Sequence, residues 1–232
     1  ANCGRLAPHY RPMKNACVVV IGHVDHGKTS LVHALTGIET DRLAEEKRRG
    51  LSIGNGYAHK SYGTGTIDFI DAPGHEDFIA AMVAGATGAR AALLVISATE
   101  GVCAQTREHL AIAALLGIKT AVIAVTKSDL LPPDLAANAL GGIKRALDNT
   151  EFVKMPFVLC SAVTRAGLEA LHAELESLLG QALDTSAPLH SFLPIDRVFS
   201  IAGRGTVVTG TLLGGRLTVE DTATLLPTDQ KI

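Results

Sequence analysis

The sequence predicts an α/β fold, with a mostly parallel β-sheet and helices on both faces, followed by the beginning of an antiparallel β-barrel. Short, continuously apolar runs alternate with helix-like segments, which is typical of parallel strands buried on both sides. The first run ends in a glycine turn and is followed by a predicted helix at Lys28–Thr36. The predicted strands are Cys17–Ile21, Thr66–Ile70, Ala92–Ser97, Thr120–Val125 and Pro156–Cys160.

From residue 185 the pattern changes to short β-rich runs separated by glycine pairs, which is typical of barrels. About four strands of the usual five to six residues fit into this region. Because so small a piece of barrel leaves unpaired edges, we expect the native chain to continue past Ile232. We therefore predict a leader or expression remnant at 1–12, an α/β domain at 13–184 and an incomplete barrel domain at 185–232.

Composition excludes several classes of protein. The formal net charge is −2 and the isoelectric point about 6.5, so nothing global attracts nucleic acid, and any such contact must be local. No apolar run reaches the roughly 18 residues of a membrane span, and 1–12 lacks the apolar core of a signal peptide. The cysteines form no C-x-x-C pair, which argues against a zinc site or a disulfide framework and favours a cytoplasmic location. They are Cys3, Cys17, Cys103 and Cys160.

The stretch GHVDHGKTS, residues 22–30, permits two interpretations. His23, Asp25 and His26 could be metal ligands. The same letters also spell G-x-x-x-x-G-K-T, a loop that cradles phosphates. The phosphate interpretation explains more of the residues, because the metal interpretation gives no role to the glycine, lysine and threonine that follow. On the phosphate interpretation, both histidines are simply loop residues.

Four other residues of this stretch have physical roles in binding phosphate. Gly22 and Gly27 allow backbone angles that turn successive N–H groups into one concavity at a helix N-terminus, where anions are favoured. Lys28 supplies a positive charge to the terminal phosphates, and Thr29 supplies a hydroxyl for Mg²⁺.

The motif DAPGH, residues 71–75, follows an apolar strand. Asp71 ends that strand and is placed to hold Mg²⁺, as a Walker-B acid does. An ordinary strand-ending turn is the alternative for this motif taken alone. The phosphate loop upstream favours the metal role.

The motif TKSD, residues 126–129, follows another apolar strand. A carboxylate at Asp129 can accept two hydrogen bonds from an edge of guanine that adenine does not offer, while Lys127 would lie along the base. Such a site rejects the wrong base because its own buried acceptors would be left unpaired. Ser161 and Ala162, after the last strand, would present backbone to guanine O6, although a plain strand-to-helix turn remains the alternative for them.

The segment 38–56 is rich in charge and then in glycine, without a sustained apolar face. A solvated helix followed by a loop is its simplest interpretation. Its position just after the phosphate loop and helix keeps a functional interpretation open.

Together these motifs resemble the translational GTPase family. GHVDHGKT, DAPGH, TKSD and SAV occur in the family's order, and the resemblance runs from about Met13 to Ile232. LTGIETDRLAEEKRRGLSI is most similar to switch I of the bacterial selenocysteine-specific branch, and GVCAQTREHL matches a segment that this branch shares with the general aminoacyl-tRNA factors. The resemblance implies a P-loop GTPase fold followed by a partial translation-factor barrel.

The resemblance also implies roles for individual residues. His75 would orient the attacking water, with Val24 and Ile53 as an apolar gate around it. Thr29, Ser52 and Asp71 would hold Mg²⁺, with Ser52 in place of the family's threonine, while Gly54 and Asn55 depart from the family's usual residues. The contacts to GTP and GDP would come from Asp25, His26, Gly27, Lys28, Thr29, Ser30, Thr126, Lys127, Asp129, Ser161, Ala162 and Val163.

For function, the resemblance implies ribosome-stimulated hydrolysis of GTP and delivery of selenocysteyl-tRNA to the ribosome. Asp196 and Arg197 match an aminoacyl-pocket pair, although a surface ion pair is an equal alternative for them. A messenger hairpin would be bound by domains beyond this sequence, and no membrane is involved. Two other functions stay open: a general aminoacyl-tRNA elongation factor, and a nucleotide-gated binding module that hydrolyses nothing. A P-loop kinase is less favoured, because it has no use for TKSD.

Overall fold

The computed structural model describes residues 14–41, 48, 52–181, 191–203, 205–210, 212 and 217–232. The chain divides into two units, Ala1–Asp184 and Thr185–Ile232, and each is described here by itself. Most of the charge-rich segment 42–51, the predicted leader at 1–12 and the junction at 182–190 lie outside the described residues.

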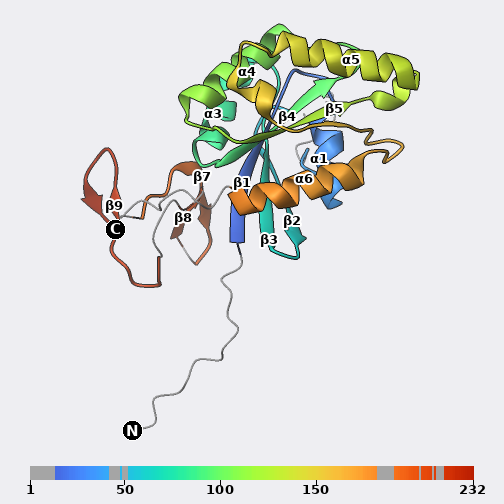
Figure 1. The fold of residues 1–232 in the computed structure, drawn as a ribbon. Helices are drawn as coiled ribbons and strands as arrows, with labels where there is room; N and C mark the ends of the chain where they lie inside the picture. Colours follow the sequence, from blue (N-terminus) through green and yellow to red (C-terminus); the bar gives the residue numbers. More distant parts are fainter. Residues whose placement is uncertain are drawn as a thin grey trace. The chain divides into compact units, whose positions relative to one another are not determined.

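The N-terminal unit is built on a six-stranded sheet with the strand order β2-β3-β1-β4-β5-β6 (Figure 1). All neighbours are parallel except β2, which runs antiparallel to β3. This confirms the predicted α/β fold with a mostly parallel sheet. The strands are β1 (Lys14–Ile21), β2 (Gly56–Tyr62), β3 (Gly65–Asp71), β4 (Ala91–Ser97), β5 (Ala121–Thr126) and β6 (Phe157–Leu159).

Helices cover both faces of this sheet. In Figure 1, α3, α4 and α5 lie on one side, and α1 and α6 lie on the other. The α-helices are α1 (Lys28–Thr36), α3 (Ile79–Thr87), α4 (Ala104–Leu115), α5 (Pro133–Ala146) and α6 (Leu168–Gln181). Short 3₁₀ turns are η1 (Glu76–Phe78), η2 (Ser128–Leu130) and η3 (Glu151–Lys154). None of the described helices is long and apolar enough to cross a membrane.

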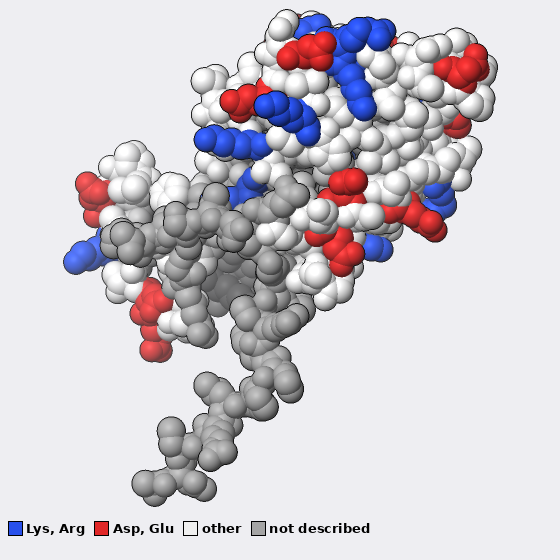
Figure 2. All heavy atoms as spheres, in the orientation of Figure 1, with Lys and Arg blue, Asp and Glu red and all other residues white. Residues whose placement is uncertain are grey.

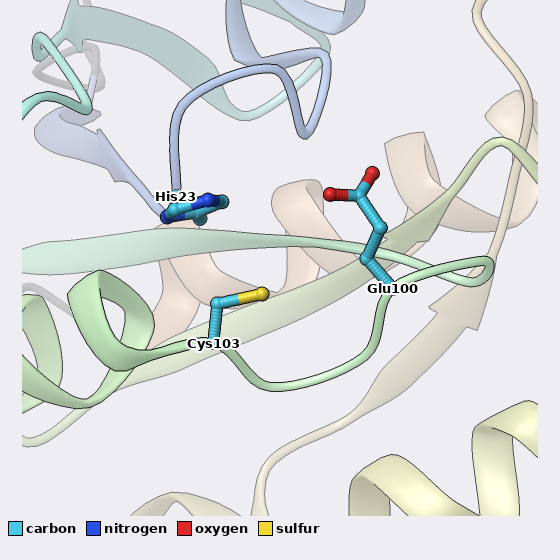
Figure 3. A group of neighbouring side chains, drawn as sticks. All are labelled: His23, Glu100 and Cys103. Carbon is cyan, nitrogen blue, oxygen red and sulfur yellow. The ribbon is translucent and has the colours of Figure 1, made fainter.

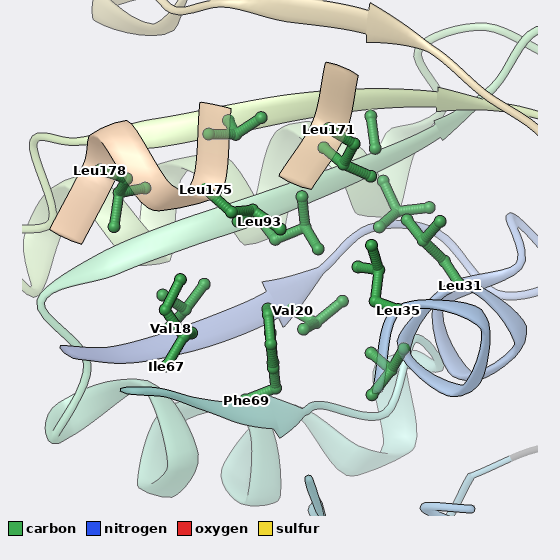
Figure 4. Packing of buried hydrophobic residues seen from close by; sticks show 14 of the residues in the cluster. Val18, Val20, Leu31, Leu35, Ile67, Phe69, Leu93, Leu171, Leu175 and Leu178 are labelled. Carbon is green, nitrogen blue, oxygen red and sulfur yellow. The ribbon is translucent and has the colours of Figure 1, made fainter. Parts of the chain in front are cut away.

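Alternation along the central strand divides the core into two layers. Val18 and Val20 of β1 point to the layer that α1 and α6 cover, shown in Figure 4. Val19 and Ile21 point to the layer on the other face. All four side chains are fully buried. Burial on both faces explains why the sequence reads as a continuous apolar run instead of alternating.

The edge strand β2 was missed in the sequence. Its residues, GYAHKSY, carry only one buried side chain, Ala58, because an edge strand has one neighbour and faces solvent. It pairs with β3 from Gly56↔Asp71 to Tyr62↔Gly65. A strand with so many polar residues offers no apolar run to detect.

The second unit contains only antiparallel pairs: β7 (Ile195–Ile201) with β8 (Gly205–Gly210), and β9 (Thr224–Leu225) with β10 (Gln230–Lys231). These strands agree with the predicted change to an antiparallel β region. Val198 is 63% exposed and Phe199 44% exposed, because a two-stranded ribbon cannot bury side chains on both faces.

Candidate nucleotide site

The glycine turn after β1 has the backbone geometry that a phosphate loop requires. Gly22 has a φ of 145°, and a Cβ there would collide with the carbonyl oxygen of Val95. Gly27 caps α1 in the left-handed region, with a φ of 83°, and Asp25 has a φ of 59°. These angles turn the chain sharply into α1, so that its unpaired amides face outward at the positive end of the helix dipole.

Two side chains of α4 hold the back of this loop. The Gly22 amide donates to Nδ1 of His109 at 3.2 Å, and the Val24 amide donates to Oε1 of Gln105 at 3.3 Å. Because these amides are already bonded, an anion would meet the amides that follow, at the start of α1. No role was predicted for His109 and Gln105, although their four-residue spacing puts both on one helix face.

Lys28 is 7% exposed, and its ammonium donates to the carbonyls of Gly22 at 3.1 Å and His23 at 2.8 Å. Burial lowers the pKa of Lys28 to about 8, and the charges of Asp71, Asp25 and Asp41 only partly oppose this. The loop thus holds a poorly solvated cation, which a polyanion would stabilise.

A hydroxyl–carboxylate network lies beside this lysine. Thr29 Oγ1 donates to Oδ2 of Asp71 at 2.8 Å, and Thr40 Oγ1 donates to the same oxygen at 2.7 Å. Ser52 Oγ lies 3.3 Å from Thr29 Oγ1 and donates to Oδ1 of Asp41 at 2.8 Å. The predicted set Thr29, Ser52 and Asp71 is therefore brought together, whereas Thr40 and Asp41 were not anticipated from the sequence.

Asp71 is the residue in this network that fits a cation best. It is 1% exposed, and its Oδ1 has no hydrogen-bond partner among the described residues. Burial raises its pKa, although hydrogen bonds from Thr40 and Thr29 and the charge of Lys28 act in the opposite direction. A buried carboxylate oxygen without a partner, next to two hydroxyls, is a donor set suited to Mg²⁺.

Thr126 connects the TKSD motif to the phosphate loop. Its hydroxyl lies within hydrogen-bond distance of two carbonyls, that of His26 at 2.7 Å and that of Ile96 at 3.3 Å, and the side chain is buried. Because His26 is 100 residues away in sequence, this bond fixes the loop against the end of β5.

The two loops predicted to hold the base also meet. Ser128 donates its amide to the carbonyl of Cys160 at 3.3 Å, and Ser161 Oγ accepts the amides of Val163 and Thr164 at 3.2 and 3.1 Å. Ser161 is fully buried, so its side chain shapes the turn that carries the exposed Val163.

Lys127 and Asp129 lie beside this turn. Lys127 has a φ of 57° and its ammonium pairs with Glu100 at 3.1 Å, while Asp129 is exposed within η2. An exposed carboxylate next to a lysine in a fixed left-handed conformation leaves the face of this loop open to a ligand.

An open hollow of about 560 Å³ lies along α1. The phosphate-side residues Thr29 and Ser30 line it together with Ala162, Val163 and Arg165 from the base-side loop. The hollow thus borders Thr29 and the turn at Ala162, whereas Lys28, Asp71 and Asp129 are not among its lining residues.

His75 lies at the start of η1. Its Nδ1 accepts the Asp77 amide at 3.3 Å and lies 3.4 Å from the Asp77 carboxylate, and the ring packs near Phe78. Gly74 approaches the phosphate loop so closely that a Cβ there would lie 2.7 Å from the Val24 amide nitrogen and would collide with Lys28 Nζ. Val24 and Ile53, the predicted gate, are half-buried, and their assignment stays a prediction.

In the second unit, Arg197 is exposed on β7, and the side chain of Asp196 lies outside those described. Their assignment to an aminoacyl pocket also stays a prediction.

These features define a class of protein. A strand, a glycine turn, a Lys-Thr pair opening a helix and a buried aspartate bonded to that threonine form a P-loop nucleotide-binding site. The model of the Elongation factor Tu GTP binding domain family matches residues 13–181. The chain therefore belongs to this family of translational GTPases.

Individual relatives point to one branch of the family. The chain is 43% identical over 215 residues to the selenocysteine-specific elongation factor of Desulfomicrobium baculatum. The match covers 90% of this chain and 33% of that protein. It is 43% identical over 206 residues to the factor of the same name from Escherichia coli K12, covering 88% and 33%. The chain thus spans about a third of the length of these curated relatives.

Solved structures agree with this likeness. A bacterial selenocysteine-specific elongation factor, EF-Sec, superposes with a TM-score of 0.87 at 38% identity, covering 94% of this chain and 38% of that one. The elongation factor SelB of Methanococcus maripaludis, in complex with the GTP analogue GPPNHP, superposes with a TM-score of 0.82 at 31% identity, covering 94% and 46%.

Proposed function

We propose that this chain is the nucleotide-dependent switch of an elongation factor that delivers selenocysteyl-tRNA to the ribosome. The observation that carries the nucleotide part is the pairing of a buried ammonium, Lys28, with a buried and incompletely satisfied carboxylate, Asp71, at the start of one helix. The tRNA part rests on the similarity to factors named selenocysteine-specific.

In this proposal the chain binds GTP mainly through charge. Lys28 and the amides at the start of α1 neutralise the β- and γ-phosphates, and Ser30 lies next along the helix. Thr29, Ser52 and Asp71 would hold Mg²⁺, which when bound neutralises further phosphate charge. The fit is supported by the partnerless Oδ1 of Asp71. Asp25 helps to order the phosphates from the turn.

Guanine would be selected by the loop after β5 and the turn after β6. Lys127 lies along the base, Asp129 accepts hydrogen bonds from its edge, and the Ser161–Val163 turn presents backbone to O6. The bond from Thr126 to the His26 carbonyl supports this proposal, because it couples the base loop to the phosphate loop.

His75 would orient the water that attacks the γ-phosphate, within the gate of Val24 and Ile53. The imidazole is bonded to its own turn through Asp77, so it must leave this contact to reach the water. Unaided hydrolysis should therefore be slow, near 10⁻⁴ to 10⁻³ per second as in the comparable Ras case. Contact with the ribosome would reorient the side chain and accelerate the reaction.

Contacts with RNA must be local. Acidic and basic side chains are intermingled on the face of the molecule in Figure 2, without one continuous field of a single sign over its described atoms. Asp196 and Arg197 would contribute to the aminoacyl pocket, where a guanidinium could distinguish an ionised selenol from a serine hydroxyl. Recognition of a messenger hairpin belongs to domains beyond this sequence.

Calorimetry with Mg²⁺ tests the nucleotide part directly. GDP and GTP should bind and ATP should not. Failure to bind either guanine nucleotide would refute the proposal. His75→Ala should keep GTP affinity and lose ribosome-stimulated hydrolysis. Glu76→Gln, an exposed change on the same short helix, is the matched control and should keep both. Stimulated turnover that persists in His75→Ala would refute the role of this histidine.

The rival functions give different results. A non-hydrolysing module would bind GTP but show no turnover with or without ribosomes. A general aminoacyl-tRNA factor, in its full-length form, would bind seryl-tRNA as tightly as selenocysteyl-tRNA. The proposed function requires a clear preference for the selenocysteyl form.

A further inference from the structure

A second cluster of potential ligands lies where the phosphate loop meets the start of α4. One ligand atom each from His23, Glu100 and Cys103 lies within 4.8 Å of the other two. In Figure 3 the three side chains lie around one space, with the Glu100 carboxylate on the opposite side from His23 and Cys103. Glu100 and Cys103 come from the loop after β4, which lies about eighty residues further along the sequence.

His26 lies against two members of this cluster. Its Nε2 lies 3.7 Å from Glu100 Oε2 and 3.7 Å from Cys103 Sγ. The His26 side chain is fully buried. The His23 and His26 rings meet edge to face with centroids 5.0 Å apart.

These separations suit a tetrahedral ion. Zinc–nitrogen, zinc–oxygen and zinc–sulfur bonds of about 2.0–2.3 Å put ligand atoms of a tetrahedral site about 3.3–3.8 Å apart. Both distances from His26 Nε2, 3.7 Å each, fall in this range. The separations among the His23, Glu100 and Cys103 ligand atoms, at most 4.8 Å, would have to shorten by about 1 Å at most. Imidazole, thiolate and carboxylate together favour Zn²⁺ over Mg²⁺, which prefers oxygen ligands alone.

The half-buried His23 and the Glu100 carboxylate each keep an atom that a metal could bind. His23 Nδ1 is buried without a hydrogen-bond partner among the described residues. Glu100 binds Lys127 through Oε1 and faces His26 through Oε2, so one carboxylate oxygen can keep its lysine while the other binds a metal.

We propose that His23, Glu100 and Cys103 bind a divalent transition-metal ion of the Zn²⁺ class. His26 supplies the fourth ligand, and the Cys103 thiol releases its proton to solvent on binding. The site is distinct from the Mg²⁺ position at Thr29 and Asp71, and it joins the phosphate loop to the loop after β4. Cysteine spacing alone argued against zinc, because the other ligands are histidines and a glutamate brought together by the fold.

Cobalt(II) is the probe, because a Co²⁺–thiolate bond gives a charge-transfer absorption band in the near ultraviolet. The chain, saturated with Mg²⁺ and GDP, should bind one equivalent of Co²⁺ with this band, and Zn²⁺ should displace it. Cys103→Ser should abolish the band while keeping a helix-capping oxygen that protects the fold. Glu100→Gln, at an exposed side chain, should weaken Co²⁺ binding at least about tenfold, since even indirect partners of a metal cost this much.

Cysteine controls separate this site from adventitious binding. Cys3→Ser and Cys17→Ala, which change cysteines that are not proposed ligands, should leave the band unchanged. Loss of the band in Cys3→Ser, or its persistence in Cys103→Ser, would overturn the proposal, as would a wild-type chain that binds no Co²⁺. Because the readout is metal binding in the nucleotide-bound chain, it does not depend on GTP hydrolysis or on tRNA.

Discussion

Removal of the Thr126 hydroxyl is the sharpest test of how the site is assembled. The buried hydroxyl lies 2.7 Å from the carbonyl of His26 and 3.3 Å from that of Ile96. Thr126→Val keeps the shape and β-branching of the side chain but leaves the His26 carbonyl without this donor. Thr126→Ser is the matched control, because it keeps the hydroxyl and loses only a methyl group.

The magnitude follows from burial. A buried acceptor left without its donor costs about 1–3 kcal/mol. For a domain of this size, each kcal/mol shifts the melting temperature by about 2–4 °C, so Thr126→Val should melt about 2–12 °C below the wild type. Guanine nucleotide should also bind more weakly, because the phosphate loop loses its connection to β5.

Differential scanning calorimetry with and without GDP and Mg²⁺ measures both effects. Thr126→Ser should melt much closer to the wild type than Thr126→Val does. Equal melting temperatures for Thr126→Val and the wild type would show that the bond contributes nothing net. Equal loss in both variants would show that keeping the hydroxyl does not preserve stability, and would contradict the role given to this hydrogen bond.

Three further substitutions test separate parts of the site. Lys28→Ala should cost about 1.5–3 kcal/mol in nucleotide binding, the range for hydrogen bonds to charged groups, and titration with a fluorescent nucleotide showing no loss would contradict this. Asp129→Asn should shift preference from guanine to xanthine nucleotides in competition binding, and a variant that still selects GTP would remove Asp129 from base recognition. His109 tests pH dependence, because burial lowers its pKa to about 4. Between about pH 6.5 and pH 4, His109 is protonated in the unfolded chain but not in the folded chain, so the free energy of unfolding falls as the pH falls. At pH 5 this loss is about 2 kcal/mol relative to neutral pH. His109→Gln keeps an acceptor for the Gly22 amide without titrating, so its melting temperature should drop less between pH 7 and pH 5, and parallel curves would refute the assignment.

The fold could be predicted because its signals are local. Each buried parallel strand is a run of apolar residues, and the glycine turn before Lys28 indicates a strand–helix junction. The strand β2 could not be predicted in the same way, since its polar residues are stabilised by pairing with β3 rather than by burial.

The site was partly predictable for a different reason. Lys28, Thr29 and Asp71 belong to motifs whose chemistry is carried by residue type and spacing. Thr40 and His109 belong to none of the motifs that were assigned a role. Thr40 reaches the site through its hydrogen bond to Asp71, and His109 through the bond that it accepts from the Gly22 amide. Cys103 and His23 are separated along the chain in the same way, so their proximity is information that only the folded chain holds.

The departures in the segment before β2 illustrate how such contacts can replace family residues. Ser52 lacks the methyl group of threonine, yet its hydroxyl is held by Asp41 beside Thr29. Asn55 donates through Nδ2 to the Ala81 carbonyl of α3 at 2.6 Å, and a Cβ at Gly85 would lie 2.9 Å from that same nitrogen. The Asn55 side chain therefore connects this segment to α3 by a hydrogen bond, in the space that the missing side chain of Gly85 leaves. An apolar residue at position 55 would instead contact α3 by packing. An amide–carbonyl bond of this kind contributes about 0.5–1.5 kcal/mol net, which is small enough to break under the rearrangement that the proposed switch function requires.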